Sequence, residues 1–280
     1  MADTQNAIYA QAYSQNIMQL AQQKYSKLIN SIYIKPNVRG KTFFQDQIGE
    51  WSMETKGSRN TQTPNNDPAL ARRMGIMVDY HDNRLLDRGD ELKSISDPRS
   101  AYTIAAAQSL GRKIDDVIIG AIRGTAYSGE TGSTTAPTAS ILTVTAATMT
   151  LANILAAKKA LDDNDVDAED RYFVTNTEVL SSLLDVTEIG SADYNSVKAL
   201  VRGELDTFLG FKWIMSTRVN ASDVGYVYQK YGVCGALGAA PMVRTDERSD
   251  LSYSWQVYYE LNMGAVRLEE SRVKIVQDDS

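Results

Sequence analysis

The segment from Lys41 to about Arg84 constrains the fold most, because it predicts a long hairpin with little core of its own. Apolar and polar residues alternate along both of its sides, the period of a strand with one covered face. The alternating apolar residues are Trp51 and Met53 on the way out and Met74, Ile76, Val78 and Tyr80 on the way back. The stretch between them, KGSRNTQTPNNDPALARR, is polar and broken by prolines.

An isolated two-stranded hairpin is marginally stable in water, so this one needs a surface on which to lie. A neighbouring subunit would supply that surface. We therefore expect the apolar residues Trp51, Met53, Ile76 and Val78 to form an inter-subunit contact.

The strongest helix pattern follows at Asp97 and Pro98, a good N-cap and a residue favoured at the first helical position. Apolar residues then follow helical spacing for about 25 residues, as far as Gly124. They are Ile104, Ala107, Leu110, Ile114, Val117, Ile118 and Ala121. A helix of this length spans roughly 35–40 Å and would serve as a strut.

The rest of the chain mixes helices and strands, which predicts an α+β fold without internal repeats. From Thr148 a helix carries Leu151, Ile154, Leu155 and Leu161, and RYFVT (171–175) and FKWIM (211–215) are expected strands. Asn176 or Thr177 would cap a further helix. Apolar residues alternate in a long C-terminal strand, namely Tyr253, Trp255, Val257, Tyr259, Leu261 and Met263. A change of register at Gly264 suggests a bulge there.

Residues 1–35 form an arm rich in Gln, Asn and Tyr, ended by Pro36 and Gly40. One helical face of this arm would be apolar, with Tyr13, Ile17, Leu20, Ala21, Leu28 and Ile32. The arm is either a frayed terminal helix or a segment that docks on another surface.

Composition excludes most catalytic and metal chemistry. The 280 residues contain one cysteine, Cys234, and one histidine, His81, which rules out a disulfide framework and sites built on several Cys or His ligands. No phosphate-binding glycine motif occurs. We expect Cys234 to be buried among small residues and His81 to be exposed. The sequence thus predicts no enzyme, no cofactor and no metal site.

The net charge of −6 comes from DDNDVDAED, which holds Asp162, Asp163, Asp165, Asp167, Glu169 and Asp170. As a calcium loop it fails, because Ala168 and Val174 stand where an EF-hand needs Gly and Glu, so a solvated acidic turn is expected. Asp115 and Asp116 are explained by helical pairs such as Arg112 with Asp116. A chain with this charge balance does not grip phosphate backbones broadly.

No apolar run approaches the roughly 20 residues that a membrane span needs, and the first residues lack the features of a secretory signal. The sequence therefore predicts a soluble protein kept in a reducing compartment, without a membrane partner.

The order of these elements, and two segments above all, resemble the major capsid proteins of tailed bacteriophages with the Hong Kong 97-like fold. The segments are RYFVTNTEVLSSLLDVTEIGSADYNSVKALVRGELDTFLGFKWIMSTRV (171–219) and DPRSAYTIAAAQSLGRKIDDVIIGAIRGTAYSG (97–129). The likeness covers most of the chain from about residue 36 onward.

The resemblance implies five parts in chain order. They are an N-terminal arm (1–35), an extended β-hairpin loop (36–90), a peripheral domain with the long spine helix (91–146), an axial domain (147–242) and C-terminal strands that return to the peripheral domain (243–280). Some members crosslink through a lysine of the extended loop. Lys56 lies near its expected tip, but no complementary site is recognisable.

The function implied by the resemblance is a coat protein that assembles into pentamers and hexamers of an icosahedral head around double-stranded DNA. Its partners would be copies of itself, a separate scaffolding protein, a portal, a decoration protein and, non-specifically, packaged DNA. The protein would assemble in the host bacterial cytoplasm and reside in the virion. Two alternatives stay open: the shell protein of an encapsulating nanocompartment or a tail-tube subunit, and a hydrolase with an unrecognised carboxylate site.

Overall fold

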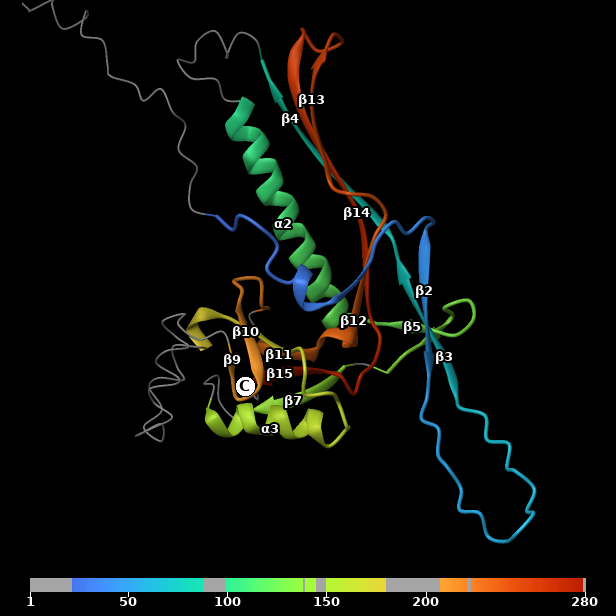
Figure 1. Ribbon diagram of the computed structural model, residues 1–280. Helices are drawn as coiled ribbons and strands as arrows, with labels where there is room; N and C mark the ends of the chain where they lie inside the picture. The colour runs from blue at the N-terminus through green and yellow to red at the C-terminus, as the bar shows by residue number, and fades with distance from the viewer. Residues whose placement is uncertain are drawn as a thin grey trace, which may run out of the picture. The chain divides into compact units, whose positions relative to one another are not determined.

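A computed structural model describes residues 22–87, 99–137, 139–144, 150–179, 207–220 and 223–278. The chain forms two compact units (Figure 1). The first comprises Met1–Tyr25, Asp79–Arg112 and Ala240–Leu261, and the second comprises Ser26–Val78, Lys113–Ala239 and Asn262–Ser280. The division falls inside α2 (Arg99–Arg123), β4 (Val78–Leu86) and β14 (Ser254–Arg267), so each of these elements contributes to both units.

In the first unit, β13 (Met242–Arg248) pairs antiparallel with residues 254–260 of β14, and β4 also pairs with β14. The predicted alternation holds for Val257 and Leu261, which are buried, whereas Tyr253 precedes the strand and is exposed. His81 is exposed, as predicted.

The predicted long helix is confirmed as α2. It ends where Gly124 donates its amide to the Gly120 carbonyl at 2.7 Å, while its expected cap, Asp97 and Pro98, lies outside the described residues. In the second unit the helix buries Ile114, Ile118 and Ile122. Ile104, placed by its spacing on the same apolar face, is instead exposed.

The second unit contains a six-stranded sheet with the order β7-β15-β11-β8-β10-β9. Its strands are β7 (Ser140–Val144), β8 (Arg171–Thr175), β9 (Thr207–Phe208), β10 (Phe211–Met215), β11 (Asp223–Gln229) and β15 (Val273–Asp278). Helix α3 (Leu151–Asp162) starts at Thr150, whose side chain accepts the Asn153 amide. The helix packs Ile154, Ala157 and Leu161 into one core with Phe173, Val227 and Val276. The predicted helix and both predicted strands of this region are therefore confirmed.

In the same unit, β1 (Tyr33–Lys35) pairs parallel with β12 (Val233–Leu237), which pairs antiparallel with residues 263–267 of β14. The bulge predicted at Gly264 does not occur in the pairing of β14 with β12, where the register runs without a shift through the pair of Ala236 with Gly264. Gly264 is needed for another reason. A Cβ atom there would stand 2.3 Å from the carbonyl oxygen of Ile76, so only glycine lets the two backbones approach so closely.

The predicted hairpin is confirmed, with different bounds. Strands β2 (Thr42–Ile48) and β3 (Leu70–Ile76) pair antiparallel, and two short strands, β5 (Tyr127–Ser128) and β6 (Thr134–Thr135), extend the sheet beyond β3. We call residues 42–76 the ribbon. Trp51 and Met53, expected in the outgoing strand, lie beyond its end in the loop 49–69, and the returning strand is broken at Met77 before β4 begins.

The described part of the arm, residues 22–35, is not α-helical: it contains a 3-10 helix (Ile29–Ser31) and β1. Leu28 and Ile32 are nevertheless buried. The arm's other predicted apolar residues, and most of the helix predicted after Asn176, lie outside the described residues. Among the described residues no helix is both long enough and apolar enough to span a membrane.

Candidate inter-subunit surface

The ribbon presents one face to solvent. Phe44 with Met74, Asp46 with Arg72, and Ile48 with Leu70 are cross-strand pairs on this outer face, since directly paired residues of an antiparallel ladder share a side. Ile48 and Leu70 are 74% and 78% exposed, and Phe44 and Ile76 are also exposed. The apolar pairs stand on either side of the charged Asp46–Arg72 pair, and exposed apolar side chains bordered by polar ones mark surfaces that another molecule covers.

The opposite face seats the root of the ribbon on a core of the second unit. Phe43 is buried there with Met77, Ala236, Val266 and Leu268. Its ring fills the space that a side chain at Gly75 would need, 2.2 Å from where that Cβ would stand. The root of the ribbon is therefore packed against this core, whereas the outer face and the loop of the ribbon are exposed to solvent.

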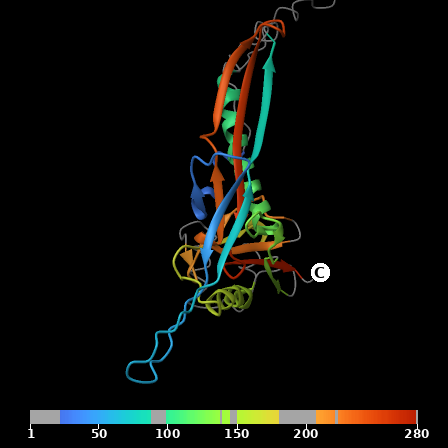
Figure 2. The ribbon, with the colours of Figure 1, turned by 90° about the vertical axis from the view of Figure 1, so that its right-hand side faces the viewer.

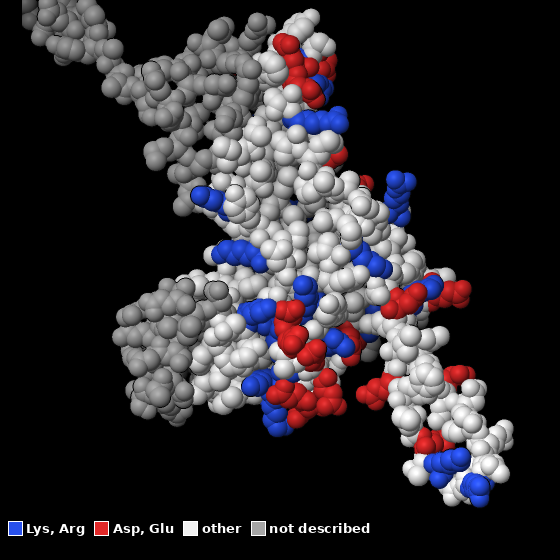
Figure 3. Space-filling view, viewed as in Figure 1, with Lys and Arg blue, Asp and Glu red and all other residues white. Residues whose placement is uncertain are grey.

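The loop from residue 49 to 69 extends away from the sheet (Figures 1 and 2). Gly49 donates its amide to the Ala69 carbonyl at 2.7 Å, and Asn66 donates its side-chain amide to Glu54 at 3.0 Å, so the two sides stay close after the strands have ended. Trp51 is 73% and Met53 99% exposed. Basic and acidic side chains lie together near the far end of the loop (Figure 3). The loop thus offers apolar area together with charged side chains of both signs.

The predicted contact residues are only partly brought together. Ile76 lies on the outer face and Val78 begins β4, both exposed, whereas Trp51 and Met53 lie in the loop rather than beside them. Phe44, Ile48 and Leu70 were missed by the sequence analysis. In the strand TFFQDQI the exposed side carries Phe44, Asp46 and Ile48. Because Asp46 is polar, this side does not show the apolar alternation from which an exposed apolar face would have been predicted.

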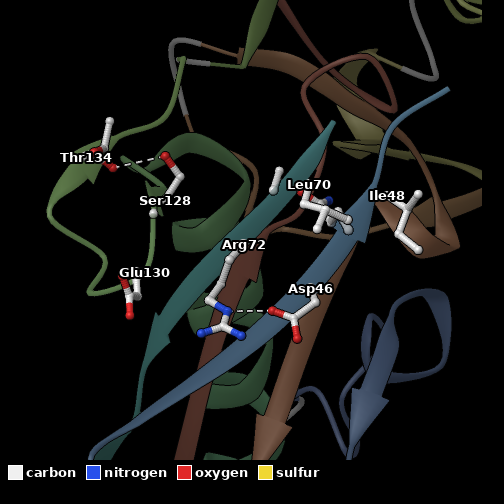
Figure 4. A pocket seen from close by; sticks show the side chains of 10 residues that line it. Asp46, Ile48, Leu70, Arg72, Ser128, Glu130 and Thr134 are labelled. Carbon is white, nitrogen blue, oxygen red and sulfur yellow. Dashed lines mark hydrogen bonds and ion pairs between the residues drawn. The ribbon is translucent and has the colours of Figure 1, made fainter. Parts of the chain in front are cut away.

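A hollow of about 810 Å³ lies beside the ribbon, lined by Asp46, Ile48, Leu70, Arg72 and Glu130 among others (Figure 4). Asp46 and Arg72 form an ion pair at 2.5 Å. The hydrogen bond from Arg72 holds the pKa of Asp46 below its usual value. The Arg72 guanidinium also lies 5.5 Å from the centre of the Phe44 ring. The hollow combines apolar walls with a fixed ion pair, as protein contact surfaces commonly do.

A buried carboxylate holds the start of the described chain. Asp115, fully buried on α2, accepts the Ser26 hydroxyl at 2.6 Å and the amides of Lys27 and Leu28 at 3.1 Å each. Asp116 instead lies 3.5 Å from Arg218. Both carboxylates were expected to form helical pairs, and for Asp115 this is wrong because the carboxylate accepts hydrogen bonds from residues almost ninety positions away in the chain.

The acidic loop is exposed, as predicted, but part of its charge is compensated. Asp162 pairs with Arg171 at 2.6 Å, Asp163 with Lys159 at 2.7 Å, and Asp170 with Lys212 at 2.5 Å. Within the described residues, no group of three or more His, Cys, Asp and Glu side chains could hold a metal ion.

Cys234 is fully buried, as predicted, and burial raises its pKa to about 11. A thiol that is neutral and inaccessible is a poor nucleophile.

Comparison with known proteins gives a consistent result. A family profile described as phage capsid protein matches residues 5–279. No protein of curated function matches the chain.

Solved structures share the fold at low sequence identity. A capsid structure of cyanophage P-SCSP1u superposes with a TM-score of 0.79 at 15% identity, covering 98% of this chain and 94% of the other. A structure from Mycobacterium phage Che8 gives a TM-score of 0.74 at 16% identity, covering 96% and 97%. The capsid of Ralstonia phage GP4 gives 0.71 at 11% identity, covering 99% and 96%.

Proposed function

The chain belongs to the phage capsid protein family, and from that premise we propose that its ribbon is the element through which each subunit grips the next. The protein itself is a structural protein that forms the capsid shell. One observation carries the proposal: the outer face and loop of the ribbon expose Ile48, Trp51, Met53 and Leu70, although the root of the same ribbon is fully packed.

Rings of five or six copies require head-to-tail contacts, in which two different patches meet. A projecting ribbon provides one such patch, and the body of the adjacent copy provides the other. The edge strand β2 also offers an open side for strand addition, since in the described sheet it pairs only with β3, although its Phe44 carbonyl already accepts a hydrogen bond from Lys35 at 3.0 Å. Many modest contacts of this kind hold a closed shell together.

The finer architecture is part of the proposal. Residues 36–90 correspond to the extended loop of the Hong Kong 97-like fold, α2 to its spine helix and residues 147–242 to its axial domain, in a shell of pentamers and hexamers. We include an arm at residues 1–35, and as partners a scaffolding protein, a portal, a decoration protein and packaged DNA. The acidic balance of the chain suits a wall that does not bind the DNA tightly.

Shortening the ribbon tests its role. Gly49 and Ala69 are already hydrogen-bonded across the ribbon, so residues 50–68 are replaced by a two-residue Asn-Gly turn, which suits an antiparallel pair. We expect a folded subunit with an unchanged melting temperature that builds no closed particles in negative-stain electron microscopy. Normal shells from this variant would show that assembly does not need the ribbon.

A single substitution separates assembly from folding. Trp51→Ala removes an exposed ring, so the free energy of unfolding should change by less than about 0.5 kcal/mol while the yield of shells falls. Thr63→Ala, at an exposed position of the same loop, is the matched control and should assemble normally. Equal losses of stability and assembly in Trp51→Ala would place the ring in the subunit's own core.

Protease protection gives an independent measurement. Lys56 and Arg59 are exposed in the loop, so trypsin should cut free subunits there and spare assembled ones. Equal cleavage of both forms would contradict the proposed contact. The alternative of a nanocompartment is distinguished by the contents of purified particles, since a phage head protects DNA from nuclease.

A further inference from the structure

The C-terminal end of α2 is closed by a buried arginine. Arg267 of β14 is fully buried and donates from Nη1 to the carbonyls of Ile122 at 2.8 Å and Gly124 at 2.9 Å, and from Nη2 to that of Pro137 at 2.9 Å. Carbonyls at a helix C-terminus lack partners within the helix and attract positive charge. Arg267 thereby ties α2, the chain at Pro137 and β14 into one rigid junction.

The root of the ribbon carries a second buried arginine. Arg73 of β3 donates from Nε to the Leu268 carbonyl at 2.8 Å, and Gln47 of β2 donates to the same carbonyl at 2.9 Å. Both strands of the ribbon are thus tied to the segment directly after β14.

Glu270 links the two arginines. Its Oε2 accepts from Nη2 of Arg73 at 2.6 Å, while its Oε1 lies 3.6 Å from Nε of Arg267. That Oε1 and that Nε are both buried and form no hydrogen bond with any described group. A charge-assisted hydrogen bond between nitrogen and oxygen is about 2.7–2.9 Å long, so 3.6 Å is too far for one. The carboxylate is therefore hydrogen-bonded to Arg73, whereas its contact with Arg267 is an ion pair without a hydrogen bond.

We propose that Glu270 is the positioning residue of the ribbon: it couples the ribbon root to the junction at the end of α2 and so sets the direction in which the ribbon leaves the subunit. The inference rests on the proposed function of the ribbon. The 3.6 Å separation between Glu270 and Arg267 leaves the root a limited adjustment, which a subunit needs if it occupies rings of five and of six. Loss of the carboxylate charge uncouples Arg73 of the root from Arg267, while the hydrogen bonds of Arg73 and Gln47 to the Leu268 carbonyl remain.

Glu270→Gln keeps the shape of the side chain and removes its charge. We expect soluble, folded subunits whose ribbon direction is no longer fixed, with a roughly tenfold lower yield of shells of the normal diameter, the low end for a lost hydrogen bond to a charged group. Aberrant or open particles should replace them in electron micrographs. Glu269→Gln is the matched control, since Glu269 pairs with Arg272 at 2.5 Å rather than with Arg73 or Arg267.

Two further variants keep the test decisive. If Glu270→Gln does not fold, Arg73→Lys keeps the positive charge but loses the forked geometry, and it should give the same mixture of particles. Ile154→Val, in the core under α3, lowers stability at a distance from the ribbon and should leave shell diameter unchanged.

Uniform shells from both Glu270→Gln and Arg73→Lys would overturn the proposal. Aberrant shells from Ile154→Val would also overturn it if this variant melts at the same temperature as Glu270→Gln, because the assembly defect would then follow stability alone. Either result leaves the ribbon's role standing as long as the shortened ribbon fails to assemble. Normal shells from the shortened ribbon would instead refute the proposed function itself.

Discussion

Removing the buried carboxylate of Asp115 should destabilise the second unit strongly. Asp115→Ala deletes three hydrogen bonds of 2.6, 3.1 and 3.1 Å and leaves the buried Leu28 amide without this acceptor. Hydrogen bonds to charged groups contribute about 1.5–3 kcal/mol each, and an unsatisfied buried donor costs a further 1–3 kcal/mol. Because such effects do not add fully, and removal of a buried charge offsets part of them, we expect a net loss of about 3 kcal/mol.

Thermal and urea unfolding measure this loss. For a chain of this size, about 3 kcal/mol corresponds to a melting temperature lower by roughly 6–12 °C. Hydrogen exchange of the Lys27 and Leu28 amides should accelerate as well, which ties the loss to these bonds.

Asp116→Ala is the control at the next position. Asp116 is partly exposed and lies 3.5 Å from Arg218, and exposed ion pairs contribute about 0–1 kcal/mol. If both variants lose the same stability, or if Asp115→Ala loses less than about 1 kcal/mol, the assignment of Asp115 as the holder of residues 26–28 is incorrect.

Two further predictions concern buried positions. Gly264→Ala should lower the free energy of unfolding by more than about 2 kcal/mol, because its Cβ would meet the Ile76 oxygen at 2.3 Å. Gly120→Ala, where a Cβ meets nothing within 4 Å, should stabilise α2 by about 0.5–1 kcal/mol; chemical denaturation compares the two, and equal effects would contradict the close approach. For Cys234, burial raises the pKa from 9.0 to about 11. Its neutral thiol contributes stability that is complete below about pH 9 and is lost as the pH rises to about 11, at most about 2–3 kcal/mol. Urea unfolding across this range should show a steeper decline for the natural chain than for Cys234→Ala, and parallel declines would refute it.

Local pattern predicted the regular elements well. The spacing of Ile114 and Ile118 gave α2, and RYFVT and FKWIM gave β8 and β10, because amphipathic periodicity follows directly from which side of an element is buried. The hairpin was predicted too, but its strands are shorter than expected. Trp51 and Met53 show strand-like alternation although the loop provides no ladder partner beyond Ile48.

Within the candidate surface, the sequence identified Ile76 and Val78 as exposed apolar residues but missed Ile48 and Leu70. These two residues face each other only through the register of β2 with β3. Register is set by the packing of Phe43 against Gly75 at the root, a contact between positions thirty-two apart that no local pattern encodes.

The sequence by itself determined the class of the fold, the main helices and strands, the inert Cys234 and the projecting hairpin, since each depends on neighbouring residues or on composition. The tertiary structure alone decided why Gly264 is glycine, what Asp115 holds, and how Glu270 stands between Arg73 and Arg267. Each of these involves groups far apart in the chain, and the energy of a buried charge or of a close backbone approach depends on what folding brings next to it.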